Sequence, residues 1–326
     1  NQIMMLDIVA NNEWERPIYF TGGSYEDSEY IWMKDYLQLD GLVYKLVPIK
    51  TSIDANPYEM GRIDSDLMYN IVKEWSWGNS NSNKIYHDPE TRKNSISFRS
   101  NLSRLSEVLI DEDKYEQAEE IIDLAFSKMP IDYYGYYSLW TPFVKGYYEI
   151  NRDDKAQEIV KKLSFKYSDR LNYYSSLEIF NQYNVGEEII SDIERFRNLI
   201  ETIKASGEKD ILSEQIKSFI SGSEKFNYIY GEYDFYISLS DFIISLVELN
   251  QLEYSRSILD KIEEQLIRRV SVFSNIDQDE QVYYIEGITS DINQYSRLIS
   301  QIEIYDVELH NDYDKNLKEM LSKMVE

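Results

Sequence analysis

Few side chains in this chain of 326 residues could carry out covalent or acid–base chemistry. The chain has no cysteine, which excludes thiolate zinc sites, iron–sulfur clusters, cysteine nucleophiles and disulfide bonds. The two histidines, His87 and His310, lie in neither a G-x-S-x-G nucleophile motif nor an H-E-x-x-H zinc motif. The sequence therefore predicts no catalytic residue, no metal site and no cofactor.

An acidic pair and a glycine pair are the remaining candidates for chemistry. Asp64 and Asp66, in "RIDSDLMY", could act as paired carboxylates of a self-contained hydrolase. The chain holds 59 acidic residues, so such pairs arise by chance, and the favoured interpretation is a structural or solvated role. Gly22-Gly23 follows a predicted strand, as a phosphate-binding loop would, but the G-x-G-x-x-G and Walker patterns are absent.

Aromatic residues are the stronger candidates for binding. Trp75 and Trp77 in "KEWSWG" could stack on sugars or on partner side chains, or they could fill the joint between an N-terminal cap and the helices, which we favour. The tyrosine run "DYYGYYSLW" offers the same choice between packing and a concave recognition surface. The candidate binding residues are Trp75, Trp77, Tyr86, Tyr133, Tyr134, Tyr136 and Tyr137.

Composition limits the partners. The formal net charge of −25 repels nucleic acids and anionic lipid headgroups, so we expect no nucleic-acid partner. No apolar run approaches the roughly 18 residues that a membrane span needs. Low glycine and proline contents, 12 and 6 residues, favour helices.

The hydrophobic pattern divides the chain into four parts. Residues 1–60 predict a small α/β cap, in which a strand beginning at Pro17, a helix over 26–39 ended by Gly41, and a strand "LVYKLVPIK" form one βαβ unit. Residues 61–96 predict an irregular linker with a surface loop from Gly78 to Asn83. Residues 97–182 predict helical hairpins, and residues 183–326 predict further helical repeats and C-terminal helices.

The hairpins have the spacing of tetratricopeptide repeats. In the clearest copy, Tyr115, Ala118 and Ala125 precede Pro130 at the intervals of that repeat. A second copy places Ala156 and Leu163 at the positions of Ala118 and Ala125, and a third places Ser255 and Ile262 there. The predicted fold class is mainly α: tetratricopeptide-like helical-hairpin repeats with a small N-terminal α/β cap.

Two N-terminal segments, "MMLDIVANNEWERPIYFTGG" and "YLQLDGLVYKLVPIK", resemble the region after the last membrane span in a family of multi-pass proteins. That family is common in Bacteroidetes and was formerly of unknown function. It is similar to protein O-mannosyltransferases with a tetratricopeptide-like tail. The resemblance covers roughly residues 1–180; Lys45 departs from the family pattern, where arginine is frequent. The signature positions are Asp7, Trp14, Arg16, Pro17, Tyr19, Phe20, Gly41, Tyr44 and Asp64.

The resemblance implies a C-type glycosyltransferase that moves a lipid-linked sugar to proteins outside the cytoplasm. This chain would then be its soluble C-terminal region, on the periplasmic side of the inner membrane. It would bind a protein or glycoprotein acceptor, or the protein's own membrane-embedded N-terminal part, without catalysing transfer. The alternative is an interaction scaffold of a membrane protein that has no transferase activity.

Overall fold

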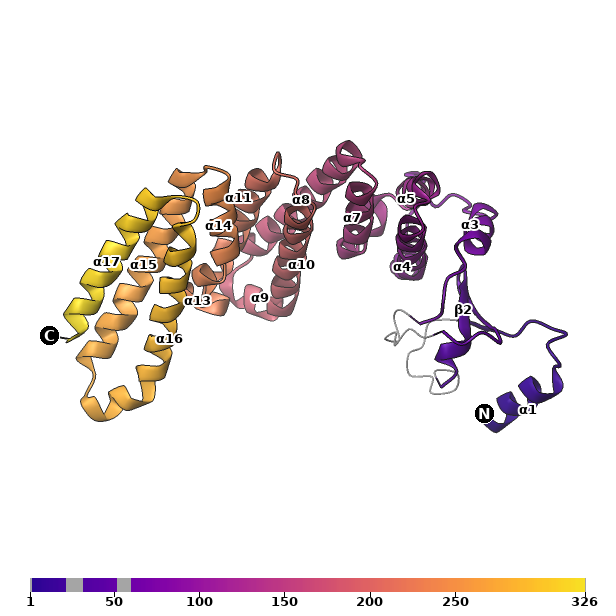
Figure 1. Cartoon of the computed structure of the whole chain (residues 1–326). Helices are drawn as coiled ribbons and strands as arrows, with labels where there is room; N and C mark the ends of the chain where they lie inside the picture. Colours follow the sequence, from indigo (N-terminus) through magenta and orange to yellow (C-terminus); the bar gives the residue numbers. More distant parts are fainter. Residues whose placement is uncertain (1, 22–31, 52–59, 326) are drawn as a thin grey trace. The chain divides into compact units, whose positions relative to one another are not determined.

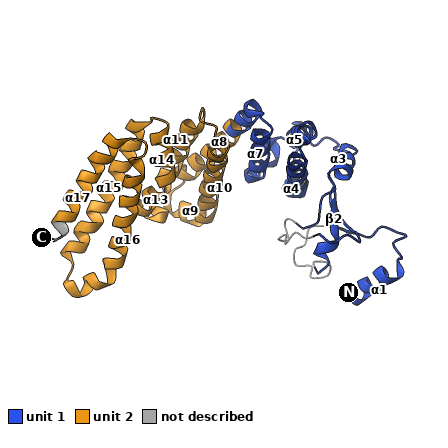
Figure 2. Ribbon diagram, viewed as in Figure 1, with its two compact units in different colours: residues 1–160 blue, residues 161–326 orange. Residues whose placement is uncertain are grey.

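The computed structural model describes residues 2–21, 32–51 and 60–325 (Figure 1). The chain divides into two compact units, residues 1–160 and 161–326 (Figure 2). Unit 1 contains the N-terminal sheet and the first helical hairpins. Unit 2 consists of helices throughout its described residues. The predicted glycine pair at 22–23 lies outside the described residues.

Unit 1 begins with α1 (Gln2–Asn11) and a three-stranded antiparallel sheet in the order β1-β3-β2. The strands are β1 (Tyr19–Thr21), β2 (Leu37–Asp40) and β3 (Val43–Leu46), and a single 3₁₀ turn, η1 (Lys34–Tyr36), precedes β2. Tyr44 of β3 is the central residue of the sheet, opposite Phe20 on one side and Leu39 on the other.

The predicted βαβ unit is wrong. Residues 37–39 of the expected helix belong to strand β2, and both neighbours of β3 run antiparallel to it; residues 26–31 of that helix are not described. Gly41 opens a two-residue hairpin turn with a φ of 70°, a conformation that glycine adopts without steric cost. The Asp40-Gly41 dipeptide was therefore a hairpin signal rather than the end of a helix.

The helices of unit 1 begin inside the range expected to be irregular. Asp64 accepts a hydrogen bond from Leu67 N (3.1 Å) and so caps α3, and Asp88 caps α4 by accepting from Thr91 N (2.9 Å). The predicted loop from Gly78 to Asn83 lies between these two helices. The helical elements are α3 (Ser65–Lys73), α4 (Pro89–Asp111), α5 (Tyr115–Lys128), α6 (Ile131–Tyr134), η2 (Tyr137–Trp140), α7 (Thr141–Glu149) and the start of α8 (Asp153–Ser176).

Unit 2 contains the rest of α8 and a series of packed helices. Its last three helices pack together: α15 contacts α16, and α17 contacts both. The elements are α9 (Ile179–Asn184), α10 (Gly186–Ala205), α11 (Leu212–Ser223), η3 (Glu224–Phe226), α12 (Asn227–Tyr230), α13 (Glu232–Ile237), α14 (Ser240–Glu248), α15 (Leu252–Asn275), α16 (Gln278–Ile302) and α17 (Val307–Val325).

Three helix pairs, α4–α5, α7–α8 and α14–α15, share one turn geometry. Asp113, Asn151 and Asn250 lie at these turns in the left-handed conformation, with φ between 57° and 59°. At each turn the next residue's N–H donates 2.8 Å to a carbonyl five residues earlier, which satisfies a helix-end acceptor. These bonds run from Lys114 to Leu109, from Arg152 to Tyr147 and from Gln251 to Leu246.

The mainly α fold and the register of the predicted repeats are confirmed. In each copy, the first of the two repeat positions (Ala118 in the clearest copy) lies five residues after the left-handed turn residue. The second repeat position (Ala125 in that copy) lies seven residues after the first. All six side chains have no exposed surface, as expected of positions on the packed face of each helix. They are Ala118, Ala125, Ala156, Leu163, Ser255 and Ile262.

The close approach of α7 to α4 and α5 depends on Gly146. A Cβ atom there would lie 3.0 Å from Ile122 Cδ1 and 3.3 Å from Ile110 Cδ1. We expect Gly146→Val to lower the free energy of unfolding by about 1–3 kcal/mol through overpacking. Gly287→Ala in α16 is the control, since nothing lies within 4 Å of its new methyl group, and it should stabilise by about 0.5–1 kcal/mol. Thermal melting distinguishes them; equal shifts would contradict the packing argument.

Candidate functional site

Trp75 and Trp77 form an aromatic cluster with Phe98 of α4. Ring centroids lie 5.5 Å apart between the tryptophans, 5.3 Å between Trp75 and Phe98, and 5.7 Å between Trp77 and Phe98. Trp75 also covers the hairpin turn, because its Cζ2 lies 3.0 Å from the position of a Cβ on Gly41. Both tryptophans are half-buried. They therefore pack between the sheet and the first helices, as the joint interpretation expects, and leave only part of each ring for a ligand.

The tyrosine run lies against the segment that follows the tryptophans. Tyr134 is buried and donates its hydroxyl proton to Ser80 O (2.8 Å). The Tyr133 ring stacks on His87, with centroids 5.4 Å apart and planes 9° apart. His87 is itself buried, with Nε2 3.0 Å from Ser82 O. Two regions predicted separately from the sequence thus converge on one part of unit 1.

Part of this region is open to solvent. Tyr86 is 81% exposed and Tyr136 is 46% exposed, while Tyr133 and Tyr137 are half-buried. We call these four residues the tyrosine surface. Its rings carry both apolar faces and hydroxyl groups, which suits contact with polypeptide side chains or sugar rings. Of the seven candidate binding residues, the four of the tyrosine surface keep exposed or half-exposed side chains, Tyr134 is buried, and the two tryptophans pack between the sheet and the first helices.

Arg99 of α4 fixes the backbone of the tyrosine surface. Its side chain has no exposed surface, and Nη1 donates to Gly135 O at 2.7 Å and to Tyr136 O at 3.5 Å. Nη2 donates to Ser95 Oγ at 2.7 Å, and the guanidinium lies 5.2 Å from the ring centroid of Trp140. Burial lowers the pKa of Arg99 to about 10. The guanidinium still carries its charge at neutral pH.

Tyr136 needs such support because its φ of 47° is unfavourable for a side chain with a Cβ atom. Gly135 precedes it with a φ of 65°. Nη1 of Arg99 donates to the carbonyl groups of both residues and so holds the turn. Sequence reasoning missed Arg99, since an arginine within a polar helix segment is usually solvated. The "YYGYY" pattern, with glycine between tyrosines, was the available signal for a special backbone conformation.

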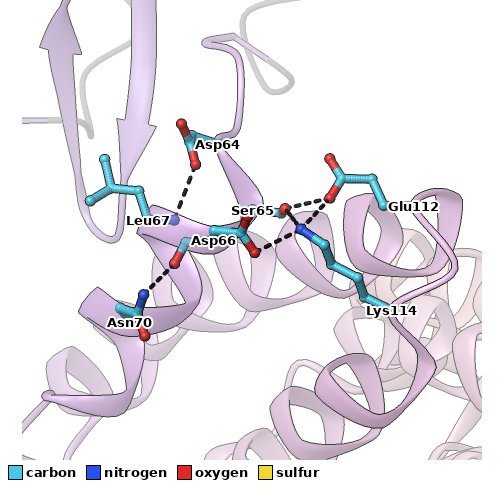
Figure 3. Close-up of polar contacts among 7 residues, drawn as sticks. All are labelled: Asp64, Ser65, Asp66, Leu67, Asn70, Glu112 and Lys114. Carbon is cyan, nitrogen blue, oxygen red and sulfur yellow. Dashed lines mark hydrogen bonds and ion pairs between the residues drawn. The ribbon is translucent and has the colours of Figure 1, made fainter.

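Asp64 and Asp66 serve different partners (Figure 3). Asp64 caps α3 through Leu67 N, whereas Asp66 forms a 2.7 Å ion pair with Lys114. Lys114 also pairs with Glu112 at 2.8 Å, and its hydrogen bonds to Asp66 and Glu112 raise its pKa. Ser65 donates to Glu112 (2.5 Å) and completes the link between α3 and the α4–α5 turn. The two aspartates do not converge on a shared site, so the geometry gives no support to a carboxylate hydrolase.

The other predicted chemical candidates have structural contacts. His310 is half-buried, with Nδ1 2.9 Å from Ile299 O. Among the described residues no three histidine, aspartate or glutamate side chains are grouped as metal ligands. In the same part of the chain, no helix combines the length and the apolar character needed to cross a membrane.

The signature residues mostly build the N-terminal sheet and its approach. Tyr19 and Phe20 lie in β1, Tyr44 is buried in β3, and Gly41 makes the hairpin turn. Before the sheet, Arg16 O accepts a 2.8 Å hydrogen bond from Asn12, and Asp7 accepts one of 3.0 Å from Asn11. Trp14 has a φ of 60° and is 52% exposed, and Arg16 and Pro17 are exposed as well.

Comparison with known protein families matches the N-terminal part of the chain. Residues 1–67 match TMEM260-associated domain 2, a domain associated with a membrane protein. The match covers α1, the sheet and the first residues of α3, and all nine signature residues fall within its range. No curated protein and no solved structure gives a significant match to the chain.

Proposed function

We propose that this chain is the extracytoplasmic C-terminal region of a membrane glycosyltransferase-like protein and binds the acceptor polypeptide rather than catalysing sugar transfer. The match of residues 1–67 to a domain associated with a membrane protein is the observation that carries the proposal. The periplasmic location, the glycosyltransferase character and the acceptor partner are parts of the proposal.

The exposed apolar residues of α1 support contact with a membrane-embedded part. Four apolar side chains of this ten-residue helix are between 51% and 83% exposed: Ile3, Met4, Leu6 and Ile8. A short helix cannot bury these side chains by itself, so a partner surface is needed to cover them. Trp14, 52% exposed, follows directly. In the proposed protein, the membrane-embedded N-terminal part covers these side chains.

The tyrosine surface supports acceptor binding. Tyrosine rings offer a large contact area at small entropic cost, and their hydroxyl groups tolerate both water and polar partners. The buried Arg99 and the stack of Tyr133 on His87 hold the surface in place before any partner arrives. Such preorganisation lowers the cost of binding. The hydrolase alternative has no comparable support, since Asp64 and Asp66 are occupied by structural contacts.

Site-specific photo-cross-linking in the full-length protein tests this function. A photoreactive phenylalanine analogue replaces Tyr86 or Tyr136 on the tyrosine surface, and Tyr305, 48% exposed in unit 2, is the matched control. We expect adducts with extracytoplasmic polypeptides that carry the transferred sugar from the first two positions and not from Tyr305. Identical adducts from all three positions would contradict a recognition role.

A transfer assay separates the proposal from the scaffold alternative. Membranes that contain the full-length protein are supplied with lipid-linked sugar and an acceptor captured by the cross-linker. Transfer that falls when Tyr86 and Tyr136 are both replaced by alanine supports acceptor binding. Capture without any transfer by the intact protein would favour a scaffold without transferase activity.

A further inference from the structure

The hairpin of α15 and α16 exposes an unusual amount of apolar surface near its tip. Four consecutive residues of α16, Val282 to Ile285, are between 44% and 83% exposed. On the facing helix, Val272 is 61% exposed. Soluble proteins rarely leave contiguous large apolar side chains in water unless a partner covers them.

A groove of about 530 Å³ lies between the two helices at this tip. Its apolar walls come from α15 and α16, and the short helix α13 approaches its inner end through ion pairs to Arg268 and Arg269. These ion pairs come from Glu232 and Asp234 in the first turn of α13, and because α13 begins only at Glu232, it does not extend further toward the tip of the hairpin. The apolar lining consists of Val272, Phe273, Ile276, Tyr283, Tyr284 and Ile288.

Acidic groups outnumber basic ones around this groove. Arg268 is paired with Glu264 (3.1 Å) and lies 3.8 Å from Glu232. Arg269 is paired with Asp291 (3.0 Å) and lies 3.5 Å from Asp234. These four carboxylates neutralise both guanidinium groups and leave an excess of negative charge.

Further carboxylates continue this charge along the rim. Glu280 lines the groove, and Asp277 and Asp279 are exposed at the start of α16. An apolar floor with an acidic rim complements an occupant that is apolar on one side and positively charged on the other.

We propose that this groove binds a basic amphipathic helix of a partner polypeptide. The apolar face of that helix lies on Val272, Tyr283 and Tyr284, beyond the N-terminal end of α13. Lysine and arginine side chains flanking that face reach Glu280 and its acidic neighbours. This groove is built from residues of unit 2, whereas the tyrosine surface is built from residues of unit 1.

Fluorescence anisotropy with the full chain and labelled model peptides tests the proposal. One peptide is an 18-residue leucine–lysine amphipathic helix, and the other has every lysine replaced by glutamate. We expect saturable binding of the basic peptide and at least roughly tenfold weaker binding of the acidic one. Val272→Ala combined with Tyr283→Ala should lower the affinity for the basic peptide by roughly tenfold or more without changing the net charge of the chain.

The matched control removes aromatic surface elsewhere in the same unit. Phe180→Ala combined with Tyr183→Ala, on α9, deletes side chains that are 74% and 67% exposed and should leave the affinity unchanged. Equal binding by the two double variants, or equal binding of the two peptides, would overturn the proposal, because general charge attraction would then suffice. A dimer of the chain that dissociates in the Val272→Ala, Tyr283→Ala variant would assign the groove to a second copy and also overturn it.

Discussion

We expect Arg99→Ala to destabilise the chain by about 3 kcal/mol, because it removes a large buried side chain and leaves its hydrogen-bond acceptors unpaired. The carbonyl groups of Gly135 and Tyr136 lose their donor, and Ser95 Oγ loses a charged partner. The turn at Tyr136, with its φ of 47°, then has no side chain to hold it. The melting temperature should fall by roughly 6–12 °C.

Two further variants separate the causes. Arg99→Met keeps much of the volume and removes the charge, so it should recover the part of the loss that comes from the cavity. Arg99→Lys keeps the charge, but its single amine cannot bond the two carbonyl groups and Ser95 Oγ from separate nitrogens as the guanidinium does, so it should remain clearly less stable than the parent. If Arg99→Lys melted at the same temperature as the parent, the two-nitrogen bonding of the guanidinium would not be the stabilising element. Loss of adducts at Tyr136 in the cross-linking experiment, with those at Tyr305 unchanged, would accompany the loss of the turn.

Asp192→Ala should cost a similar amount in unit 2, about 3 kcal/mol, because it breaks a buried ion pair between α8 and α10. The carboxylate is 1% exposed, lies 2.8 Å from Arg170 Nε and 3.2 Å from Arg195 Nη1, and accepts from the Tyr174 hydroxyl at 3.0 Å. The two arginines are 39% and 46% exposed and can regain some water, which keeps the cost near the lower end of the range for broken buried pairs.

Asp66→Ala is the matched control for Asp192→Ala. Its side chain is 73% exposed and also forms a close pair with a cation, Lys114, at 2.7 Å. A surface pair of this kind contributes about 0–1 kcal/mol. Denaturant unfolding measures both variants against the parent. Comparable losses for the two aspartates would show that burial does not govern the strength of these pairs.

The helical part was predictable because its signals are local. The positions of Ala118 and Ala125, seven residues apart, are fully buried, and the equivalent positions recur at the same interval in the other copies. This interval predicted which residues of each helix face its neighbour. The β2–β3 hairpin was missed because residues 37–40 are buried on both faces and show no alternation. Acidic residues earlier in this segment also led to the prediction of a helix, because acidic side chains stabilise the N-terminus of a helix.

The candidate site depended on contacts that sequence cannot supply. The stack of Tyr133 on His87 joins residues 46 positions apart, and the bond from Tyr134 to Ser80 spans 54. The choice between packing and binding for Trp75 and Trp77 was open in the sequence, because an aromatic residue serves both purposes equally well. Their contacts with Phe98 and Gly41 favour packing.

The recurring turn at Asp113, Asn151 and Asn250 has a consequence for how chains of this kind can change in length. Because the backbone enters and leaves each turn in the same conformation, a segment cut between equivalent points of two turns can be duplicated or deleted without a new connection. Residues 114–151 form one such cassette. A tandem copy inserted after Asn151 would meet the same left-handed asparagine at its end. The shared geometry of the turns, rather than the sequence of the helices that they connect, therefore allows the helical array to lengthen by recombination.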